Sequence, residues 1–266
     1  MWRLLRKVRF SVSPFASTRT LGHNAFVSKP TATGLSLFLE LGIELKGLSN
    51  ADTGFVINVR DIDLQVRQHA VPLFIDAIAT HYQQQRDVTF SELVDILRVA
   101  YGHLEQVFKP VYVHKILLNT NPYTNIALAA EYPEMVYYSE KFEFAAMHKL
   151  WNDQFDHAKN NELFGKCANP SGHGHNYIVE VTVKSDSLDR LDTLRMQRVI
   201  DDQVIGLLDH TNMNVDVAYF STVNPTIENI AKYAWQRLVD QFDPGVLHCI
   251  TIWESDRTSC SYYGEG

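Results

Sequence analysis

The sequence Cys167-Ala-Asn-Pro-Ser-Gly-His173-Gly-His175-Asn176, followed by Tyr177-Ile-Val-Glu-Val-Thr-Val183, couples a group of possible metal ligands to a strand. The second stretch is typical of a β-strand, in which residues i and i+2 point to the same face of a sheet. His173 and His175 can therefore converge on one metal ion, with the thiol of Cys167 nearby. The rest of the chain must supply a third ligand, a charge partner for the thiol and a substrate anchor.

The second half of the chain has the order strand, strand, helix, helix, strand, strand. Strands are predicted at 135–146, 177–184, 246–253 and 259–263, and helices at 188–208 and after 224. Asn224 is expected to cap the second helix, with Pro225 at its first position. Paired strands followed by paired helices predict the α+β class.

The first half gives the same order. Strands are predicted at 8–13, 35–45, 111–118 and 124–129, and helices at 59–79 and after Thr89, where Thr89 and Glu92 form a capping box. Phe10 precedes Phe144 by 134 residues (144 − 10), Leu93 precedes Ile230 by 137 (230 − 93), and Val113 precedes Leu247 by 134 (247 − 113). This nearly constant offset predicts a duplication, with one domain at 1–132 and a second at 133–266. Chance agreement between two α+β patterns is the alternative.

Composition fits a globular protein and excludes some partners. The formal charge of −7 argues against a general nucleic-acid binder. No apolar run approaches the roughly 18 to 20 residues of a membrane span. The 3 cysteines are too few for a disulfide framework, which predicts a reducing compartment, the cytoplasm. The first 20 residues are basic and lack acids, as in some transit peptides, but their alternation favours a strand.

A catalytic zinc commonly takes three protein ligands and keeps one position open. His148, at the end of the preceding predicted strand, is the best third candidate beside His173 and His175, although isolated histidines are more often surface or core residues. Cys167 has two interpretations. It can be a small buried hydrophobe, or a reactive thiol whose pKa is lowered by Lys166 and a nearby metal.

Further polar residues could complete a site. Asp209-His210 can form an acid/base relay, because a carboxylate orients and stabilises an imidazolium. Asp156-His157 is a second copy of this dipeptide, in a stretch predicted to be a solvated loop. Glu254 ends a strand, and its carboxylate can bind an amidine-like ring edge or remain a rim charge. Thr226 and Glu228 lie in a first helical turn, where such residues more often serve the helix end.

Taken in order, these motifs closely resemble the family of 6-pyruvoyltetrahydropterin synthase, which also includes 6-carboxytetrahydropterin synthase. The resemblance covers about 136–266. The first half of the chain resembles the same fold only in outline, chiefly through residues 53–58. The resemblance over 136–266 is carried by Phe144-Ala-Ala-Met-His148, Phe164-Gly-Lys-Cys167, His173-Gly-His175-Asn-Tyr177, Leu208-Asp209-His210, Pro225-Thr226-Ile-Glu228-Asn229, Trp253-Glu254 and Tyr263-Gly-Glu265.

The resemblance implies a role for each matching residue. It implies Zn2+ bound by His148, His173 and His175. It makes Cys167 the base, with Asp209 and His210 as its relay. Glu254 would anchor the pterin, and Thr226 and Glu228 would lie in the pterin pocket. The implied reaction is that of a carbon–oxygen lyase, which converts 7,8-dihydroneopterin triphosphate to 6-pyruvoyltetrahydropterin and releases triphosphate.

Other functions stay open. Five residues separate Cys167 from His173, as in the pyruvoyl enzymes, whereas the carboxy enzymes of the queuosine precursor pathway generally have a shorter gap. A zinc hydrolase would explain the histidines but leaves Cys167 and Glu254 without a role. A non-catalytic pterin-binding or scaffold protein is a third possibility.

The first half lacks the catalytic set. Pro14 aligns with His148, Thr120 aligns with Glu254, and His23 is isolated in a predicted loop. The resemblance implies two tandem tunnelling-fold (T-fold) units, each an antiparallel four-stranded sheet with two helices packed on one face. The first unit would then be a degenerate copy kept for assembly. A homo-oligomer, such as a trimer of tandem chains, is expected.

Overall fold

The computed structural model describes residues 1–15 and 35–264. Contacts divide the chain into a first unit, Met1–Tyr138 with Ser185–Asp189, and a second unit, Ser139–Lys184 with Arg190–Gly266. His23 and Glu265, named in the sequence analysis, lie outside the described residues. Within the described ranges, no helix combines the length and the apolar character needed to cross a membrane.

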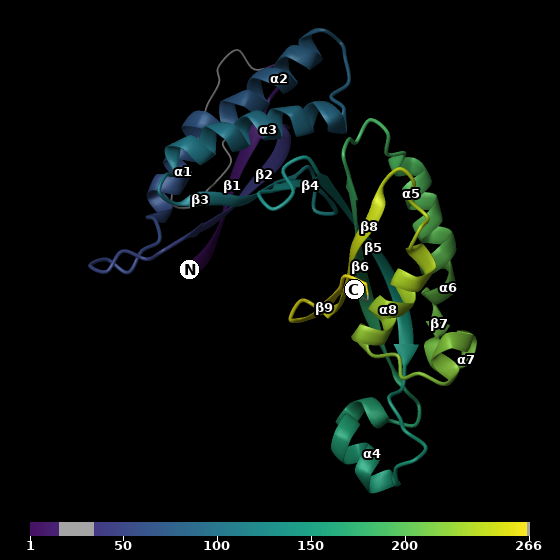
Figure 1. Ribbon diagram of the computed structural model, residues 1–266. Coiled ribbons are helices and arrows are strands. Elements are labelled where there is room, and N and C mark those ends of the chain that lie inside the picture. Colours follow the sequence, from purple (N-terminus) through teal and green to yellow (C-terminus); the bar gives the residue numbers. More distant parts are fainter. Residues whose placement is uncertain (16–34, 265–266) are drawn as a thin grey trace. The chain divides into compact units, whose positions relative to one another are not determined.

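The first unit contains a sheet with strand order β1-β2-β3-β4 and antiparallel pairing throughout. Its strands are β1 (Trp2–Val12), β2 (Leu37–Gly47), β3 (Tyr112–Asn119) and β4 (Thr124–Ala129). The helices α1 (Val59–His69), α2 (Val71–Gln83) and α3 (Phe90–Val107) lie along one face of it (Figure 1).

The single helix predicted at 59–79 is two helices, α1 and α2, which meet at Ala70. Pro72 lies in the first turn of α2. Proline has no amide hydrogen to donate and is tolerated only in a first turn, so the break falls just before it.

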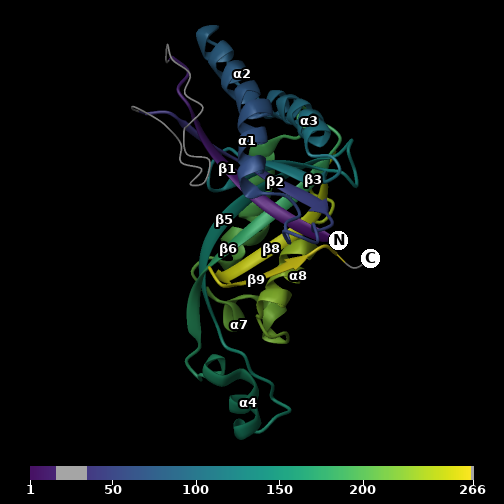
Figure 2. The same ribbon diagram turned by 90° about the vertical axis from the view of Figure 1, so that its left-hand side faces the viewer.

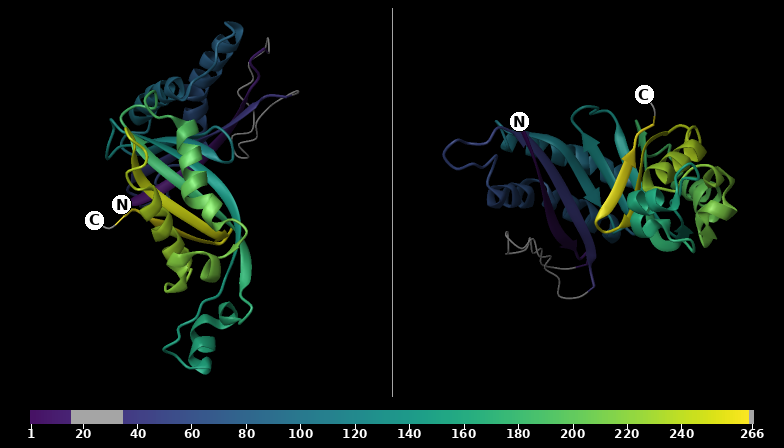
Figure 3. Two further views of the ribbon diagram at one scale, coloured as in Figure 1. Left: turned by 90° about the vertical axis from the view of Figure 1, so that its right-hand side faces the viewer. Right: turned by 90° about the horizontal axis from the view of Figure 1, so that it is seen from below.

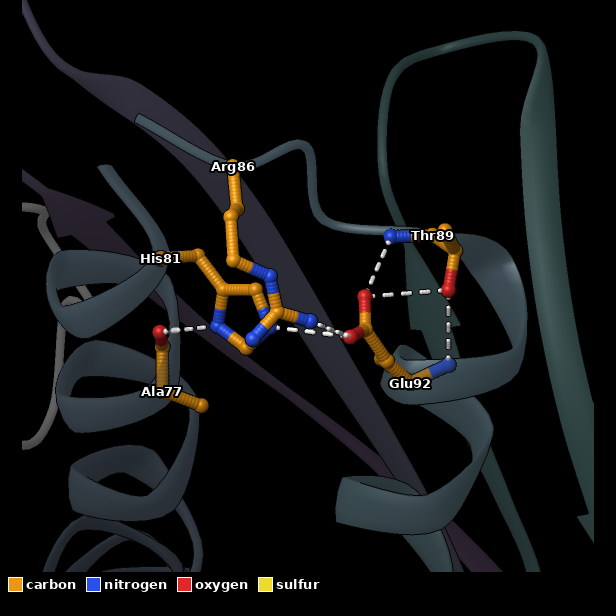
Figure 4. Close-up of polar contacts among 5 residues, drawn as sticks. All are labelled: Ala77, His81, Arg86, Thr89 and Glu92. Carbon is orange, nitrogen blue, oxygen red and sulfur yellow. Dashed lines mark hydrogen bonds and ion pairs between the residues drawn. The ribbon is translucent and has the colours of Figure 1, made fainter. Parts of the chain in front are cut away.

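A polar cluster joins the end of α2 to the start of α3 (Figure 4). The predicted capping box is confirmed: the Thr89 hydroxyl accepts from the Glu92 amide at 3.2 Å, and Glu92 Oε2 accepts from the Thr89 amide at 2.9 Å. Glu92 Oε1 lies 2.9 Å from His81 Nε2 and 3.1 Å from Arg86. His81 Nδ1 lies 2.8 Å from the Ala77 carbonyl oxygen. Both ring nitrogens of His81 thus face acceptors, which is the arrangement of an imidazolium.

The second unit has strand order β5-β6-β8-β9, and β7 pairs with β5 in parallel. Its strands are β5 (Val136–His148), β6 (His173–Ser185), β7 (Thr211–Asn212), β8 (Val246–Ser255) and β9 (Thr258–Tyr262). One face of the sheet carries α5 (Thr193–Ile200), a π-helical turn η2 (Asp201–Ile205), α6 (Gly206–Leu208) and α8 (Ile227–Leu238) (Figure 3). The short helices α7 (Met213–Asp216) and η3 (Ala218–Ser221) precede α8.

An excursion beyond the end of β5 contains α4 (His157–Phe164) and the 3-10 turn η1 (Gly165–Ala168) (Figure 2). The prediction of a solvated loop at Asp156-His157 is wrong. Asp156 caps α4, because its side chain accepts a hydrogen bond from the Lys159 amide at 2.7 Å.

Two further predictions in the second unit are corrected. Thr226, rather than Asn224, caps α8, since its hydroxyl accepts from the Asn229 amide. Pro225 therefore precedes the cap instead of opening the helix. The helix predicted at 188–208 begins at Thr193 and is interrupted by the π-helical turn η2.

The strand pairs of the two units share their register. Glu40 pairs with Asn119 in the first unit and Ile178 pairs with Trp253 in the second, at offsets of 138 (178 − 40) and 134 (253 − 119). An irregularity interrupts the ladder at Glu44/Leu45 and, 138 residues later, at Thr182/Val183. Because bulges are specific features of a strand pair, this correspondence is the structural basis for the duplication proposed below.

Candidate metal centre and catalytic site

Three strand ends bring four of the predicted residues together. His148 ends β5, His173 and His175 open β6, and Glu254 lies near the end of β8. One ligand atom from each lies within 4.8 Å of all the others. Nε2 of His148 and Nε2 of His173 are 3.1 Å apart, whereas ligands of a tetrahedral zinc with bonds of ~2.0–2.1 Å lie ~3.4 Å apart. We call these four residues the histidine cluster.

The protonation state of His148 suits a metal ligand. Its side chain is 2% exposed, and Nδ1 lies 2.6 Å from the Pro225 carbonyl oxygen. Since a carbonyl only accepts, Nδ1 carries the hydrogen and Nε2 presents a lone pair to the cluster. Burial lowers the pKa of His148 and also that of His173, which favours the neutral imidazole. Metal-bound histidines typically donate the second ring N–H to such a carbonyl.

Glu254 completes the donor set. Its Oε1 lies 3.1 Å from His175 Nε2 and 3.6 Å from His148 Nε2. The His175 contact lacks hydrogen-bond geometry, and this buried nitrogen has no other partner among the described residues. Imidazole nitrogens and a carboxylate around one point fit Zn2+. The sequence predicted Glu254 as a substrate anchor and did not anticipate its place beside the histidines.

The return from the excursion into β6 requires a glycine. Gly172 has φ of 70°, a conformation that side chains disfavour, and a Cβ there would lie 2.9 Å from the His148 carbonyl oxygen. The Leu150 amide donates to the Cys167 carbonyl oxygen at 2.9 Å. These contacts fix the backbone of Cys167 and the start of β6 against the end of β5.

Cys167 lies in η1 and is partly buried. Its thiol pKa is raised, first by burial and then by the charge of Glu254. The sequence predicts instead that Lys166 and a metal lower this pKa. In the protein alone the carboxylate and the loss of water act in the opposite direction, so a thiolate there needs a positive charge such as a bound cation.

Asp209 and His210 form a pair on the edge of β5, just before β7. Asp209 Oδ1 accepts from the Ala145 amide at 2.8 Å, and its Oδ2 lies 2.8 Å from His210 Nδ1. The pKa of Asp209 is lowered, first by the Ala145 amide and then by His210. The His210 side chain is 84% exposed, and its backbone has φ of 57°. Asp209 and His210 contact Ala145, the Ile205 carbonyl oxygen and each other, and no contact within the described chain joins them to Cys167.

Thr226 and Glu228 occupy the start of α8. Thr226 is the helix cap, as the simpler interpretation expected, and it follows the carbonyl that holds His148. Glu228 lies in the first turn of the helix, where its charge raises the pKa of the Cys260 thiol after burial has done so.

Two groups beside the histidine cluster were not predicted from the sequence. The Pro225 carbonyl carries no sequence signal for its role. Tyr177 follows His175 by two residues, so the alternation that pairs His173 with His175 also places Tyr177 on their face. Its ring contacts His175, with centroids 5.5 Å apart.

The first unit carries different residues at the equivalent positions. With the offset of 138, Leu35 and Leu37 stand where His173 and His175 stand in β6. Leu37 and Thr120 line a cavity of about 630 Å³ together with side chains from α2 and α3. Leucine offers no metal ligand, so this part of the first unit holds no counterpart of the histidine cluster.

Comparisons with known proteins concern the second unit. The family model described as 6-pyruvoyl tetrahydropterin synthase matches residues 137–265. The 6-pyruvoyl tetrahydrobiopterin synthase of Homo sapiens is 36% identical over 132 residues, which are 48% of this chain and 90% of the human protein. That of Drosophila melanogaster is 39% identical over 127 residues, 46% of this chain and 75% of the fly protein.

More distant similarities are also found. The 6-carboxy-5,6,7,8-tetrahydropterin synthase of Aquifex aeolicus is 25% identical over 99 residues, 35% of this chain and 60% of that protein. A solved structure of Caenorhabditis elegans 6-pyruvoyl tetrahydropterin synthase has 32% identity and a TM-score of 0.46, covering 49% of this chain and 96% of that one. Since the chain covers 90% of a relative to which it is 36% identical, it belongs to the 6-pyruvoyl tetrahydropterin synthase family and is an enzyme of that type.

Proposed function

We propose that the protein is a zinc-dependent lyase that converts 7,8-dihydroneopterin triphosphate to 6-pyruvoyltetrahydropterin and releases triphosphate. The observation that carries this proposal is the histidine cluster, which lies in the segment matched by the family model together with Cys167. In this proposal His148, His173 and His175 hold Zn2+. When bound, the ion supplies Lewis acidity to oxygens of the substrate side chain and acidifies the neighbouring C–H groups.

Cys167 is proposed as the base. Its thiolate takes a proton from a side-chain carbon, the C–H electron pair forms a carbon–carbon double bond, and triphosphate leaves with the electrons of its C–O bond. The enol produced then becomes the 2′ ketone by moving one proton. The C1′ carbinol becomes the second ketone as its C–H and O–H protons move, with the C–H electron pair, to C6 and N5 of the ring C=N bond, so the dihydropterin becomes the tetrahydropterin without an external reductant. Because burial and Glu254 raise the pKa of the free thiol, the thiolate depends on a nearby positive charge.

Glu254 is proposed as the pterin anchor. An ionised carboxylate accepts two parallel hydrogen bonds from the ring N–H and 2-amino group of a pterin. Its position 3.1 Å from His175 would hold the ring close to the histidine cluster. Thr226 and Glu228 would line the pterin pocket. Glu254 as a fourth metal ligand is the alternative, because a carboxylate at this distance can also bind the ion.

Asp209 and His210 are proposed as the relay that exchanges the protons Cys167 handles. Asp209 holds His210 by a contact of 2.8 Å, which stabilises the charged imidazole. The exposed ring has no recorded contact with Cys167 within the described chain. We propose that it serves the site of a second copy of the chain.

The assembly is proposed to be a homo-oligomer built from two tandem T-fold units per chain, a degenerate unit at 1–132 and a catalytic unit at 133–266. The shared register and irregularity of the two sheets support the duplication. A trimer of tandem chains would then supply six units and three sites. A mass of one chain in light scattering would contradict it. The cytoplasmic location predicted from the cysteines stays a prediction.

Product identification tests the function. The zinc-loaded protein is incubated with 7,8-dihydroneopterin triphosphate, and the products are identified by mass. We expect 6-pyruvoyltetrahydropterin and one triphosphate per turnover, and a loss of about 100-fold or more in Cys167→Ala with zinc retained. Cys260→Ala, in β9, is the matched control.

Each alternative predicts a different outcome. A 6-carboxytetrahydropterin product would assign the protein to the sibling activity to which the Aquifex aeolicus relative belongs. Full activity of Cys167→Ala would favour a zinc hydrolase. Pterin binding without triphosphate release would favour a scaffold, and would sink the proposed reaction.

A further inference from the structure

The phenol of Tyr177 is buried and lacks a partner. Tyr177 lies in β6 and is 0% exposed. Its hydroxyl oxygen has no hydrogen-bond partner among the described residues. A buried tyrosine hydroxyl usually finds one, since leaving it unpaired is unfavourable for folding. The hydroxyl therefore needs an explanation that the folded chain alone does not give.

The contacts of the Tyr177 ring account for a buried aromatic side chain at this position, but not for its hydroxyl group. The Tyr177 ring stacks on Phe144, with centroids 5.0 Å apart and an interplanar angle of 16°. It also meets His175 at 5.5 Å and His148 at 6.2 Å, edge to face in both cases. A phenylalanine would make all of these ring contacts, and it would avoid burying an unpaired polar group.

The hydroxyl belongs to the surroundings of the histidine cluster. Ile178 pairs with Trp253, so the next antiparallel pair places Tyr177 beside Glu254. The Tyr177 side chain therefore lies on the same face of the sheet as His175 and beside Glu254.

We propose that Tyr177 donates its O–H to a side-chain oxygen of the substrate held at the histidine cluster. This inference rests on the proposed function, because the substrate of that reaction carries hydroxyl oxygens on the side chain that faces the metal. The side chain is preferred to the pterin ring because the Tyr177 ring packs on His148 and His175, whose Nε2 atoms point into the cluster. Tyr177 then fixes the orientation of the oxygen beside the carbon that loses its proton.

The Tyr177→Phe variant tests whether the hydroxyl contacts the substrate or only stabilises the fold. In Tyr177→Phe we expect bound zinc to be unchanged and the Tm to be equal or higher, because no protein hydrogen bond is lost. We expect kcat/KM to fall about 10- to 100-fold, and the substrate-induced rise in Tm to be smaller than in the wild type. Tyr233→Phe is the control, since that buried ring contacts Tyr219 and Phe220 instead of the site histidines.

The outcomes are distinguishable. A lower Tm with unchanged kcat/KM would assign the hydroxyl to the fold, through a buried water for example, and would overturn the inference. An unchanged Tm, kcat/KM and substrate-induced shift would overturn it as well. Both results leave the proposed function intact if the wild type releases triphosphate. No turnover by the wild type would remove the proposed function and this inference together.

Discussion

His148 is held in one tautomer by the backbone of a different element. The Pro225 carbonyl takes the Nδ1 hydrogen at 2.6 Å, which leaves Nε2 free to bind a cation. Glu254 Oε1 then lies 3.6 Å from that nitrogen. At this distance the carboxylate can bind either a metal ion or the substrate.

The Glu254→Gln variant distinguishes a substrate anchor from a metal ligand. The amide keeps the size of the side chain but loses the charge and one acceptor. If Glu254 anchors the pterin, we expect zinc binding to be retained and KM to rise about 10-fold or more, as expected when a charged hydrogen bond is lost. Zinc content by elemental analysis and steady-state kinetics measure both effects. Loss of zinc at unchanged total protein would instead make Glu254 a metal ligand.

Among the structural elements, the junction between the segment that contains α4 and the start of β6 lies against the backbone of His148. Gly172 lets the chain turn beneath His148 without a side chain. In Gly172→Ala, the left-handed backbone strain of ~1–2 kcal/mol and the short contact with the His148 carbonyl should move the imidazole. We expect the zinc affinity to fall about 10-fold, as measured by competition with a chelator.

Gly174→Ala is the matched control for that variant. A Cβ at Gly174 would lie 3.5 Å from the Ala146 carbonyl oxygen, which is an ordinary contact. Its zinc affinity should equal that of the wild type. If both variants lost the same zinc affinity, the effect of an added Cβ at this junction would not act through His148.

The sequence predicted the elements better than their ends. Alternation revealed the strands, but β6 starts at His173 rather than Tyr177, because pairing with β5 extends the ladder through a stretch rich in glycine and polar residues. Asn224 had a capping side chain in sequence. In the structure its Oδ1 instead accepts from the Trp151 amide at 2.9 Å, and Thr226 becomes the cap. A long-range partner of this kind leaves no local signal.

The candidate site was predictable for the same reason that the strands were. His148, His173 and His175 meet because they lie at the ends of neighbouring strands, which spacing and order reveal. The raised pKa of Cys167 and the place of Glu254 depend on burial and side-chain direction, so they needed coordinates. The same holds for the finding that, among the described residues, His210 and Cys167 make no contact with each other.

The contact between His81 at the end of α2 and Glu92 at the start of α3 predicts that the free energy of unfolding depends on pH. The pKa of His81 is raised above its ordinary 6.5, first by the Ala77 carbonyl and then by Glu92. The contribution of His81 to the free energy of unfolding is therefore complete below pH 6.5, and it is lost as the pH rises through the pKa of His81 in the folded protein. The pKa of Glu92 is lowered to about 2 from 4.5, so its contribution is present above pH 4.5 and is lost toward pH 2. The contact should be strongest between these limits.

The check is the Tm of wild type and His81→Gln between pH 5 and 9. We expect the difference to be largest near pH 5 to 6 and to shrink at higher pH. His103→Gln is the control, because His103 Nδ1 lies 3.4 Å from a backbone carbonyl, that of His69, instead of a carboxylate. A difference that does not change with pH would contradict an ionised His81–Glu92 pair.

For the whole molecule, the exposed Asp209-His210 pair predicts a site shared between copies. Cys167→Ala and His210→Ala should each be inactive alone. When the two variants are co-expressed, chains of the two kinds would together form some complete sites, and triphosphate release should recover in part. Lack of recovery in a mixed oligomer of verified composition would place the relay within a single chain.

The central claim is one zinc-dependent pterin triphosphate lyase site in each chain, located in the second unit. The most direct measurement is a zinc titration of the metal-free protein while triphosphate release from 7,8-dihydroneopterin triphosphate is followed. The account predicts that the rate rises linearly and levels off at one equivalent of zinc per chain. Release that is absent at every zinc concentration, or equally fast without zinc, would contradict it.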